Sequence, residues 1–590
     1  MSLKKYAYVT MLSTDSYLPG VLALFQSIKQ TNTKIENFAV VVNEDIKKET
    51  KDRLEEKGYN VILKPKINIP DTIMSKNKIL PYWNNTFDKF NIFDLVEYDK
   101  IVYLDSDIYV NKNIDELFDK SNMSAVTAGK SYPGNESWRE LNSGVMVVEP
   151  KSGIREELIK KMKEMVKSKK KIKKFSSLSN KRLFSNKKLL ELKSRVIKHM
   201  QGIGDQDVIE EYFEWKDNKD LHLDEKYNVF ANYSDYYAKK YINDLSCIHF
   251  IGAKKPWNFT PKELSRIRNK LSYKKRTQYD FLENYTKIIN DEAENYKTRF
   301  SLIMPMKNAE QYINETLESI RKQNYKNVEI IIIDDNSSDM SKNKVQKYKE
   351  QHPEMVIKLL NTTQSHNGPG GARNVGLDNA TGSYVLFIDA DDKLNEGALG
   401  NISKSIALNP EADLFTLGYQ LTRLDVDDNK VKNMKLNAGK MQESRFFQIG
   451  ANTAGSIWNI CARRKLFESG KKLRFKENCK FEDLPTKVEL FTRTQKKIKS
   501  VPHITHTQFS RPGNSITGTL KFKDMKRLID ANIEIANLRP QVDSKDKMYI
   551  NVRMFMMPVV LGWLVQKCIH NKIDVIKIKN RNHKDNEKDK

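Results

Sequence analysis

Apolar and polar positions follow two similar series along the chain. The first series opens with YAYVTML, continues with VLALFQSIKQ and reaches FAVVVN. The second opens with FSLIMPM, continues with INETLESIRKQ and reaches VEIIIID. Continuous apolar strands that alternate with helical patterns predict mainly parallel sheets covered by helices on both faces. The pattern therefore predicts two α/β domains of the same architecture.

The 590 residues are enough for about two to four domains. We expect the first α/β domain to span residues 1–260 and the second to span residues 299–520. Between them, residues 261–298 are charged and have helical spacing, which predicts a helical connector. Residues 521–590 are also helical in pattern, and we interpret them as a helical C-terminal extension.

The composition is that of a soluble globular chain, with 39% hydrophobic and 30% charged residues. No apolar run reaches the roughly 18 residues that predict a membrane helix. The opening MSLKKYAYVTML lacks the apolar core of a signal peptide. Four scattered cysteines without metal-binding spacing suit a reducing compartment. We therefore expect a cytoplasmic location, with the inner face of the membrane as the place of any peripheral contact.

The formal net charge of +26 is unevenly distributed. Residues 160–198 hold 14 Lys and 2 Arg against 2 Glu, a net charge of +14. Nucleic-acid binding usually combines basic residues with stacking aromatics or a known module, and this segment has only Phe175 and Phe184. We therefore expect no nucleic-acid partner. Contact with anionic membrane or an acidic acceptor and a plain solvated insertion both remain open.

A buried-looking strand ends on two carboxylates in IVYLDSDIYV, residues 101–110. Asp105 and Asp107 are two positions apart, so both point to one side at the strand end where open α/β sheets bind ligands. Their mutual repulsion favours a bound divalent cation. Further on, IHFIGAKKPW offers His249 as a metal ligand and Lys255 as a cation for phosphate. Taken alone, D-x-D is more often a surface turn, and a lone histidine more often a core residue.

The chain also contains VTMLSTDSY, LNSGVMVV and GIGDQDVI. With these motifs in the order that the family has, residues 5–260 resemble glycosyltransferase family 8. The resemblance implies Mn²⁺ or Mg²⁺ held by Asp105, Asp107 and His249, and transfer with retention of the anomeric configuration. It implies UDP-glucose or UDP-galactose as donor. One departure is Gly202, where glycogenin-like members have an aspartate. The resemblance assigns catalytic positions to Asp205 and Gln206, and donor binding to Met11, Ser13, Thr14, Tyr17, Lys89, Asn142, Gly252 and Lys255.

A second acidic series follows in the C-terminal half. IIIIDDNSSD ends a strand on two aspartates, NGPGGARNVGL is a glycine-rich turn before a helix, and YVLFIDADDKL repeats the strand that ends on aspartates. The glycine-rich turn lacks the G-K-[ST] ending of a Walker loop. FEDLPTKVELF then offers Glu482 and Asp483, either as a catalytic base or as acids that favour a helix N-terminus.

These motifs make residues 299–520 resemble glycosyltransferase family 2. The resemblance implies an inverting transfer in which Asp483 is the base and Glu482 orients it or shares the role. It implies Asp391 as the metal ligand. It assigns nucleotide-sugar binding to Pro305, Asp335, Arg373 and Asp389.

Both resemblances imply an α/β fold of the GT-A type, with a Rossmann-like, mixed and mainly parallel sheet in each domain. The chain is then expected to be a bifunctional metal-dependent transferase that adds hexoses from UDP-sugars to a growing glycan. The acceptor would be a bacterial surface polysaccharide, a glycoprotein or a lipid-linked glycan. The alternative is one active site, with the other half serving as a glycan-binding or membrane-docking module.

Overall fold

The computed structural model describes residues 4–69, 81–176, 203–252, 254–259, 261–270, 276–363, 367–424, 431–436, 456–494, 498–510, 522–551 and 553–554. The chain divides into two compact units, Met1–Glu292 and Ala293–Lys590, each considered by itself. Part of the predicted basic segment (177–198) and most of the predicted C-terminal extension lie outside the described residues.

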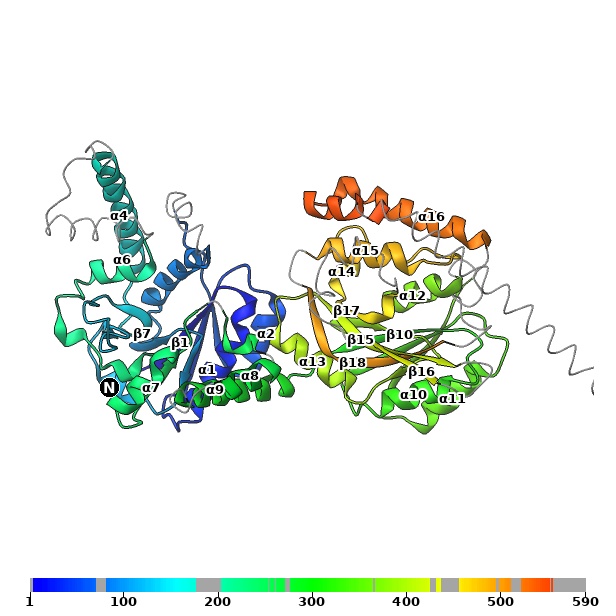
Figure 1. Cartoon of the computed structure of the whole chain (residues 1–590), viewed down its shortest axis with the longest axis horizontal. Coiled ribbons are helices and arrows are strands. Elements are labelled where there is room, and N and C mark those ends of the chain that lie inside the picture. Colours follow the sequence, from blue (N-terminus) through cyan, green and yellow to red (C-terminus); the bar gives the residue numbers. More distant parts are fainter. Residues whose placement is uncertain are drawn as a thin grey trace, which may run out of the picture. The chain divides into compact units, whose positions relative to one another are not determined.

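The first unit is built on a six-stranded sheet with the order β3-β2-β1-β4-β7-β6 (Figure 1). The four strands from β3 to β4 are parallel, β7 runs antiparallel to β4, and β6 runs antiparallel to β7. Strands β1, β4 and β6 therefore end at the same edge of the sheet. The strands are β1 (Tyr6–Leu12), β2 (Asn37–Val42), β3 (Asn60–Leu63), β4 (Lys100–Leu104), β6 (Ala125–Val126) and β7 (Asn142–Val148).

Apolar clusters on both faces of this sheet explain its continuous hydrophobic strands. Helix α4 covers part of one face through Leu158, Met162 and Val166, which follow the helical spacing of four residues. The helices are α1 (Leu18–Lys29), α2 (Lys48–Glu56), α4 (Ile154–Ser176), α6 (Asp205–Tyr212) and α7 (Ser234–Lys240), with 3-10 segments η1 (Asp15–Tyr17) and η3 (Pro81–Asp94).

A second, small sheet has the order β5-β9-β8, and it positions residues from opposite ends of the unit. Strand β5 (Ile108–Val110) follows the D-S-D turn directly and pairs antiparallel with β9 (Cys247–His249). Ile108 lies opposite His249 in this register. Strand β8 (Val229–Phe230) pairs parallel with β9, with Phe230 beside His249.

The range that the sequence suggested as a connector holds α8 (Pro261–Lys270) and α9 (Arg276–Asn295). Helix α9 packs against the first unit through Tyr285, whose hydroxyl is 3.3 Å from the Gly20 carbonyl and 3.2 Å from the Ser106 carbonyl. The Tyr285 ring also stacks on Phe250. Most of α9 is therefore an integral helix of the first unit, and it supports the backbone of the D-S-D turn.

The second unit contains a nine-stranded mixed sheet with the order β12-β11-β10-β13-β17-β15-β18-β14, and β16 pairs with β15. The strands are β10 (Phe300–Met306), β11 (Val328–Asp334), β12 (Val356–Asn361), β13 (Tyr384–Phe387), β14 (Lys393–Leu394), β15 (Leu414–Leu424), β16 (Val431–Leu436), β17 (Ile460–Arg463) and β18 (Ile498–Ser510). Strands β10 to β13 are parallel, as β1 to β4 are in the first unit.

Helices α10 (Ile313–Arg321), α11 (Ser341–Gln351), α12 (Gly368–Asp378), α13 (Ala398–Leu408), α14 (Lys465–Glu468), α15 (Asp483–Arg493) and α16 (Phe522–Asn537) complete the second unit. The predicted α/β fold class, with a mixed Rossmann-like sheet of the GT-A type in each half, is confirmed. Within the described residues, no helix combines the length and the apolar character needed to cross a membrane.

Candidate active sites

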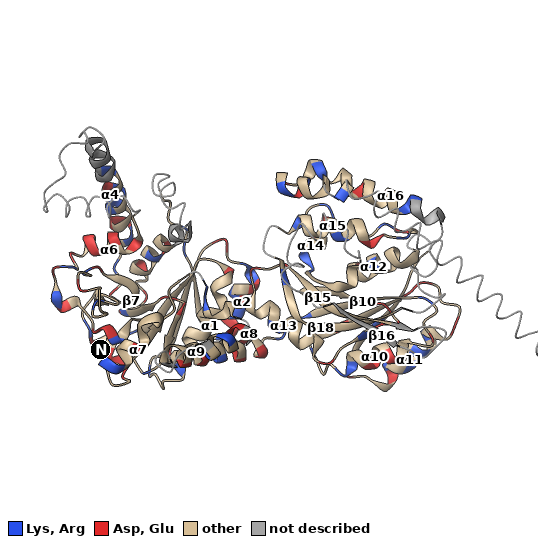
Figure 2. Ribbon diagram, viewed as in Figure 1, with Lys and Arg blue, Asp and Glu red and all other residues tan. Residues whose placement is uncertain are grey.

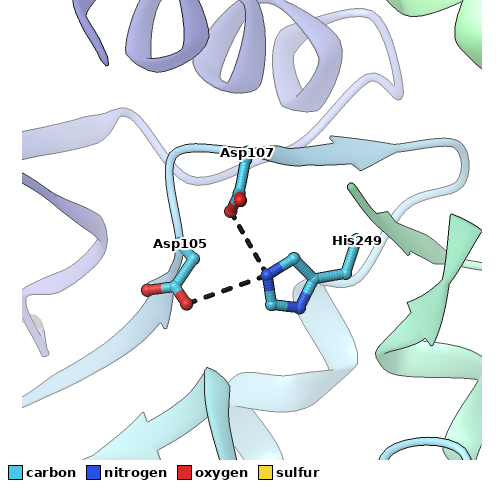
Figure 3. Close-up of side chains that lie close together, drawn as sticks. All are labelled: Asp105, Asp107 and His249. Carbon is cyan, nitrogen blue, oxygen red and sulfur yellow. Dashed lines mark ion pairs between the residues drawn. The ribbon is translucent and has the colours of Figure 1, made fainter. Parts of the chain in front are cut away.

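The first candidate site begins at the D-S-D turn. The Asp105 amide donates to the Gly144 carbonyl at 2.8 Å, and the Ile108 amide donates to the Asp105 carbonyl at 3.1 Å. This turn passes the chain from β4 to β5, and the pairing of β5 with β9 brings His249 alongside both carboxylates (Figure 3). Its Nε2 atom lies 3.2 Å from Asp107 Oδ1 and 3.8 Å from Asp105 Oδ2.

The imidazole of His249 is held in one orientation. Its Nδ1 atom is 3.0 Å from Asn228 Oδ1, and Asn228 Nδ2 donates to Asn142 Oδ1 at 2.8 Å. Because the Asn228 oxygen must accept, Nδ1 carries a proton, and Nε2 is the atom that faces the carboxylates and can ligate a cation. Gly144 leaves room for the ring, since a Cβ atom there would lie 2.6 Å from His249 Cε1.

These three side chains fit a divalent cation. One ligand atom from each of Asp105, Asp107 and His249 lies within 4.8 Å of the others. Two carboxylates and one neutral imidazole nitrogen suit a cation such as Mn²⁺, which accepts oxygen ligands and tolerates nitrogen. In the part of the chain that the structure describes, this is the one group of three potential ligands so close together.

Two lysines flank the carboxylates. Lys255 Nζ lies 2.5 Å from Asp107 Oδ2, and Lys89 Nζ lies 3.0 Å from Asp105 Oδ1 and 3.4 Å from Asp205 Oδ2. Burial by itself would raise the pKa of Asp107, but His249 and Lys255 hold it below its ordinary value. Burial would lower the pKa of Lys89, but Asp105 and Asp205 hold it above its ordinary value. Asp107, Lys89 and Lys255 are therefore charged at neutral pH.

Sequence reasoning missed four residues of this site. Ser143 donates from Oγ to Asp205 Oδ2 at 2.7 Å and accepts from Lys89 Nζ at 2.9 Å. Tyr103 donates to Asp105 Oδ1 at 2.8 Å. Ser143 and Gly144 belong to the quoted LNSGVMVV motif, which gave a signal for them. Tyr103 lies in the quoted IVYLDSDIYV stretch, two positions before Asp105, so a local signal was present for it as well. Asn228 lies outside every quoted motif, and its role arises from a contact with the distant His249. The four missed residues are Tyr103, Ser143, Gly144 and Asn228.

The predicted nucleotide loop follows β1, at the same sheet edge as Asp105. Met11 lies near the end of β1, Ser13 and Thr14 follow it, and Tyr17 ends η1; all four are half-buried. The Tyr17 ring contacts Trp257 at 5.4 Å between centroids, and Lys255 Nζ lies 5.9 Å from the centre of the Tyr17 ring. The nucleotide loop therefore lies beside the ammonium group of Lys255.

Two predicted residues lie at the start of α6 and after β9. Gln206 is half-buried in the first turn of α6, next to the buried Asp205. Gly252 is exposed in the loop between His249 and Lys255. Gln206 and Gly252 are therefore close in sequence to Asp205 and Lys255, which take part in the charged cluster around the acidic pair.

In the second unit, Asp335 follows the end of β11 and is well anchored. Its Oδ1 atom accepts from Thr362 Oγ1 at 3.0 Å and from the Gly368 amide at 3.1 Å, and its Oδ2 atom lies 3.3 Å from Lys307 Nζ. Pro305, in the neighbouring strand β10, is half-buried. The glycine-rich turn at the start of α12 is therefore fastened to the end of β11.

Arg373 joins three motifs that are far apart in the sequence. From α12 it reaches Glu482 Oε1 at 2.5 Å and Asp389 Oδ1 at 3.3 Å. Its side chain is buried, and burial opposes its charge, but Asp389 and Glu482 hold its pKa above the ordinary value. The structure thus brings the predicted residues Arg373, Asp389 and Glu482 together at one place.

Asp483 begins α15, next to this cluster. Burial and repulsion by Glu482 raise the pKa of Asp483 to about 7. One helical turn later, Lys487 donates from Nζ to Asn459 Oδ1 at 2.8 Å, and burial lowers its pKa to about 8. A carboxyl group that titrates near neutrality can accept a proton from a hydroxyl group and release it again.

The remaining aspartates of the second D-x-D-D series have different surroundings. Asp392 is buried, and its Oδ1 atom accepts from the Phe509 amide of β18 at 3.0 Å, so it fastens this turn to the sheet. Asp391 is half-buried between Asp389 and Asp392. Unlike the first pair, these aspartates are accompanied by no close histidine ligand within the described residues.

Family models match both halves of the chain. The model described as Glycosyl transferase family 8 matches residues 8–260, and the model described as Glycosyl transferase family 2 matches residues 301–469. An uncharacterized glycosyltransferase of Haemophilus influenzae is 30% identical over 229 residues, which cover 38% of this chain and 83% of the relative.

Longer relatives match over a smaller part of their length. The minor teichoic acid biosynthesis protein GgaB of Bacillus subtilis is 27% identical over 237 residues, 40% of this chain and 25% of GgaB. This chain thus aligns with about a quarter of that relative. Among solved structures, residues 1–349 of S. aureus TarS with UDP-GlcNAc align at 19% identity and a TM-score of 0.34, over 48% of this chain and 92% of TarS 1–349.

Proposed function

Because this chain belongs to the glycosyltransferases, with a family 8 domain followed by a family 2 domain, we propose that it is a bifunctional, metal-dependent hexosyltransferase. It transfers hexoses from UDP-sugars to a growing glycan, with retention at the first site and inversion at the second. The observation that carries the proposal is that each unit ends a central parallel strand, β4 or β13, on an acidic series surrounded by buried charged partners.

At the first site, Asp105, Asp107 and His249 would hold the cation, which when bound would stabilise negative charge on the diphosphate. Lys255 exchanges its contact with Asp107 for the diphosphate when the donor binds. Lys89, Asp205 and Gln206 face the donor sugar, and Met11, Ser13, Thr14 and Tyr17 bind the nucleoside. Positive charge placed where the leaving group develops its own charge is the main source of rate acceleration at such a site.

At the second site, Asp483 is the general base. It takes the proton of the acceptor hydroxyl while that oxygen bonds to the anomeric carbon, and the bond from this carbon to the diphosphate breaks on the opposite face. Glu482 is engaged by Arg373, which leaves Asp483 as the carboxylate of the pair for proton transfer. The pKa of about 7 suits this task, because about half of the groups are ionised at neutral pH and the carboxylate is still basic.

Asp391 would hold the cation of the second site, and Pro305, Asp335, Arg373 and Asp389 would bind its nucleotide-sugar. A name such as minor teichoic acid biosynthesis protein among the relatives supports a bacterial surface polymer as acceptor. Two sites in one chain raise the local concentration of the first product at the second site. We therefore place the two transfers in succession on one glycan.

We also propose that the enzyme works in the cytoplasm at the inner face of the membrane. Helix α4 buries one face and exposes Lys160, Lys163 and Lys167 on another, and Figure 2 shows Lys and Arg along this helix. Each lysine near an anionic surface adds about 1 kcal/mol of attraction. The variant with all three changed to Gln should bind phosphatidylserine vesicles more weakly at low salt. Equal binding by the two proteins would contradict membrane contact through this helix.

The test of the two-site proposal is donor turnover by the purified chain. Wild type, Asp105→Ala/Asp107→Ala and Asp389→Ala/Asp391→Ala are incubated with a panel of UDP-sugars and Mn²⁺. Each double variant should lose turnover of one donor and keep that of the other. If wild type turns over no donor, or if both double variants match it, the proposal fails. If only the first double variant loses activity, the second unit is a binding module instead.

A further inference from the structure

Several aromatic side chains gather beside the first site and have no part in the mechanism above. Tyr132 and Tyr233 stack with ring centroids 3.9 Å apart, and Tyr236 meets Tyr132 edge-on at 5.5 Å. The rings of Trp138 and Tyr233 both lie beside Gly129. All four rings are half-buried rather than enclosed in the core. We call the set of Tyr132, Trp138, Tyr233 and Tyr236 the aromatic patch.

The aromatic patch is connected to the candidate metal centre by one buried ring. Phe230 lies edge-on to His249 at 5.8 Å between ring centroids, and the ring centroid of Tyr233 lies 6.0 Å from that of Phe230. The register of β8 and β9 fixes the first of these contacts, because Phe230 pairs with His249. A ligand on the patch would therefore lie within a few side chains of the acidic pair.

The strand order places the aromatic patch away from the nucleotide loop. Tyr132 and Trp138 belong to the segment that follows β6, whereas the nucleotide loop follows β1. In the order β3-β2-β1-β4-β7-β6, strands β1 and β6 lie on opposite sides of β4, which carries Asp105. All three strands end at the same sheet edge. The acidic pair thus separates the donor side from the side of the patch.

The segment that carries the patch is fixed in place. Glu225 accepts from the Ser131 amide at 3.0 Å and also from the hydroxyls of Ser131 and Tyr237. This carboxylate fastens the loop after β6 to α7. Gly129 has a φ of +81°, and a Cβ atom there would lie 3.0 Å from the Trp138 ring and 3.2 Å from the Tyr233 ring. A glycine is therefore what allows these rings to converge.

We propose that the aromatic patch binds the saccharide part of the acceptor of the first site. Half-exposed, pre-ordered aromatic faces stack on the apolar C–H face of a pyranose ring, and their hydroxyl groups meet the sugar hydroxyls. The position across the acidic pair from the donor loop is the one that an acceptor must occupy. This inference rests on the proposed transferase function of the first unit.

The test compares Tyr132→Ala and Tyr233→Ala with the corresponding Tyr→Phe variants in the full chain. Binding is measured by saturation-transfer NMR with methyl α- and β-glycosides of glucose, galactose and N-acetylglucosamine. Transfer to the bound glycosides is measured beside acceptor-free UDP-sugar hydrolysis. Tyr6→Ala is the matched control, because Tyr6 stacks on Phe118 near the start of β1, at the opposite sheet edge.

We expect the Ala variants to lose the NMR signal and to lower transfer at least tenfold more than hydrolysis, mainly through the acceptor KM. The Phe variants should remain within about threefold of wild type, since stacking survives. Equal binding and transfer by wild type and Ala variants would overturn the inference, as would parallel loss of transfer and hydrolysis. Saccharide binding without any donor hydrolysis would instead contradict the proposed transferase function.

Discussion

The two units share the order of their parallel strands up to β4 in the first unit and β13 in the second. The acidic residues that follow these two strands have neighbours of different charge. In the first unit, the acidic pair after β4 is accompanied by His249, Lys89 and Lys255. In the second, the acidic series after β13 is accompanied by further carboxylates, with Arg373 between Asp389 and Glu482. The same sheet edge thus carries a cation-rich site in one unit and a carboxylate-rich site in the other.

This difference bears on the chemistry that each edge can support. A cation-rich edge stabilises a leaving diphosphate, and Asp107 is a weak base there because its pKa is held below the ordinary value. A carboxylate-rich edge raises the pKa of Asp483 to about 7 and so provides a base. The proposed retaining and inverting reactions correspond to these two arrangements.

The largest expected effect comes from removing the base of the second site. Asp483→Asn keeps the shape of the side chain but cannot accept a proton, so transfer at the second site should fall about 10²–10⁴-fold. First-site turnover should be unchanged. Rates with saturating donor for each site provide the measurement. The control is Asp392→Asn, whose oxygen can still accept from the Phe509 amide; a comparable loss in both variants would argue against a specific base.

A smaller effect is expected at the first site from a residue that does not touch the cation. Asn228→Ala leaves His249 Nδ1 without its acceptor, so the apparent affinity for Mn²⁺ should fall about 10–100-fold. Titration of Mn²⁺ against UDP-sugar hydrolysis measures this. The second site should keep its metal dependence in the same protein. An unchanged Mn²⁺ titration would show that Asn228 does not orient a metal ligand.

A still smaller effect is expected from pH, which should change the rate of transfer at the second site. The pKa of Asp483 is raised, so the group is protonated and inactive below it, and second-site transfer should rise through about pH 7 and then level off. Lys487→Met removes a positive charge that lowers this pKa, so the midpoint should move to higher pH. Thermal melting checks that the variant is folded. A flat profile between pH 6 and 8, or a midpoint that moves down, would contradict this account.

The sequence predicted the acidic strand ends and the α/β architecture, because both follow from short patterns along the chain. It also selected His249, since a distant motif in the expected order supplied it. The orientation of His249 could not be predicted in the same way. It depends on Asn228 and Gly144, which reach the ring through the pairing of β8 with β9 and of β4 with β7, and pairings between distant segments leave no local pattern.

Arg373 shows the same limit in the second unit. Its motif indicated a residue near the nucleotide, but the ion pairs with Glu482 and Asp389 join positions more than a hundred residues apart in one case and sixteen in the other. The raised pKa of Asp483 follows from that burial and crowding, not from the FEDLP pattern itself. Charge balance at both sites is thus a property of the folded units.

The most direct test of the account is the anomeric configuration of the glycoside that each site makes. Asp483→Asn leaves the first site to act, and Asp105→Ala/Asp107→Ala leaves the second. Proton NMR of the products from UDP-α-sugars should show an α-linkage from the first protein and a β-linkage from the second. The same configuration from both proteins would contradict the claim that the two units catalyse transfers of opposite stereochemistry.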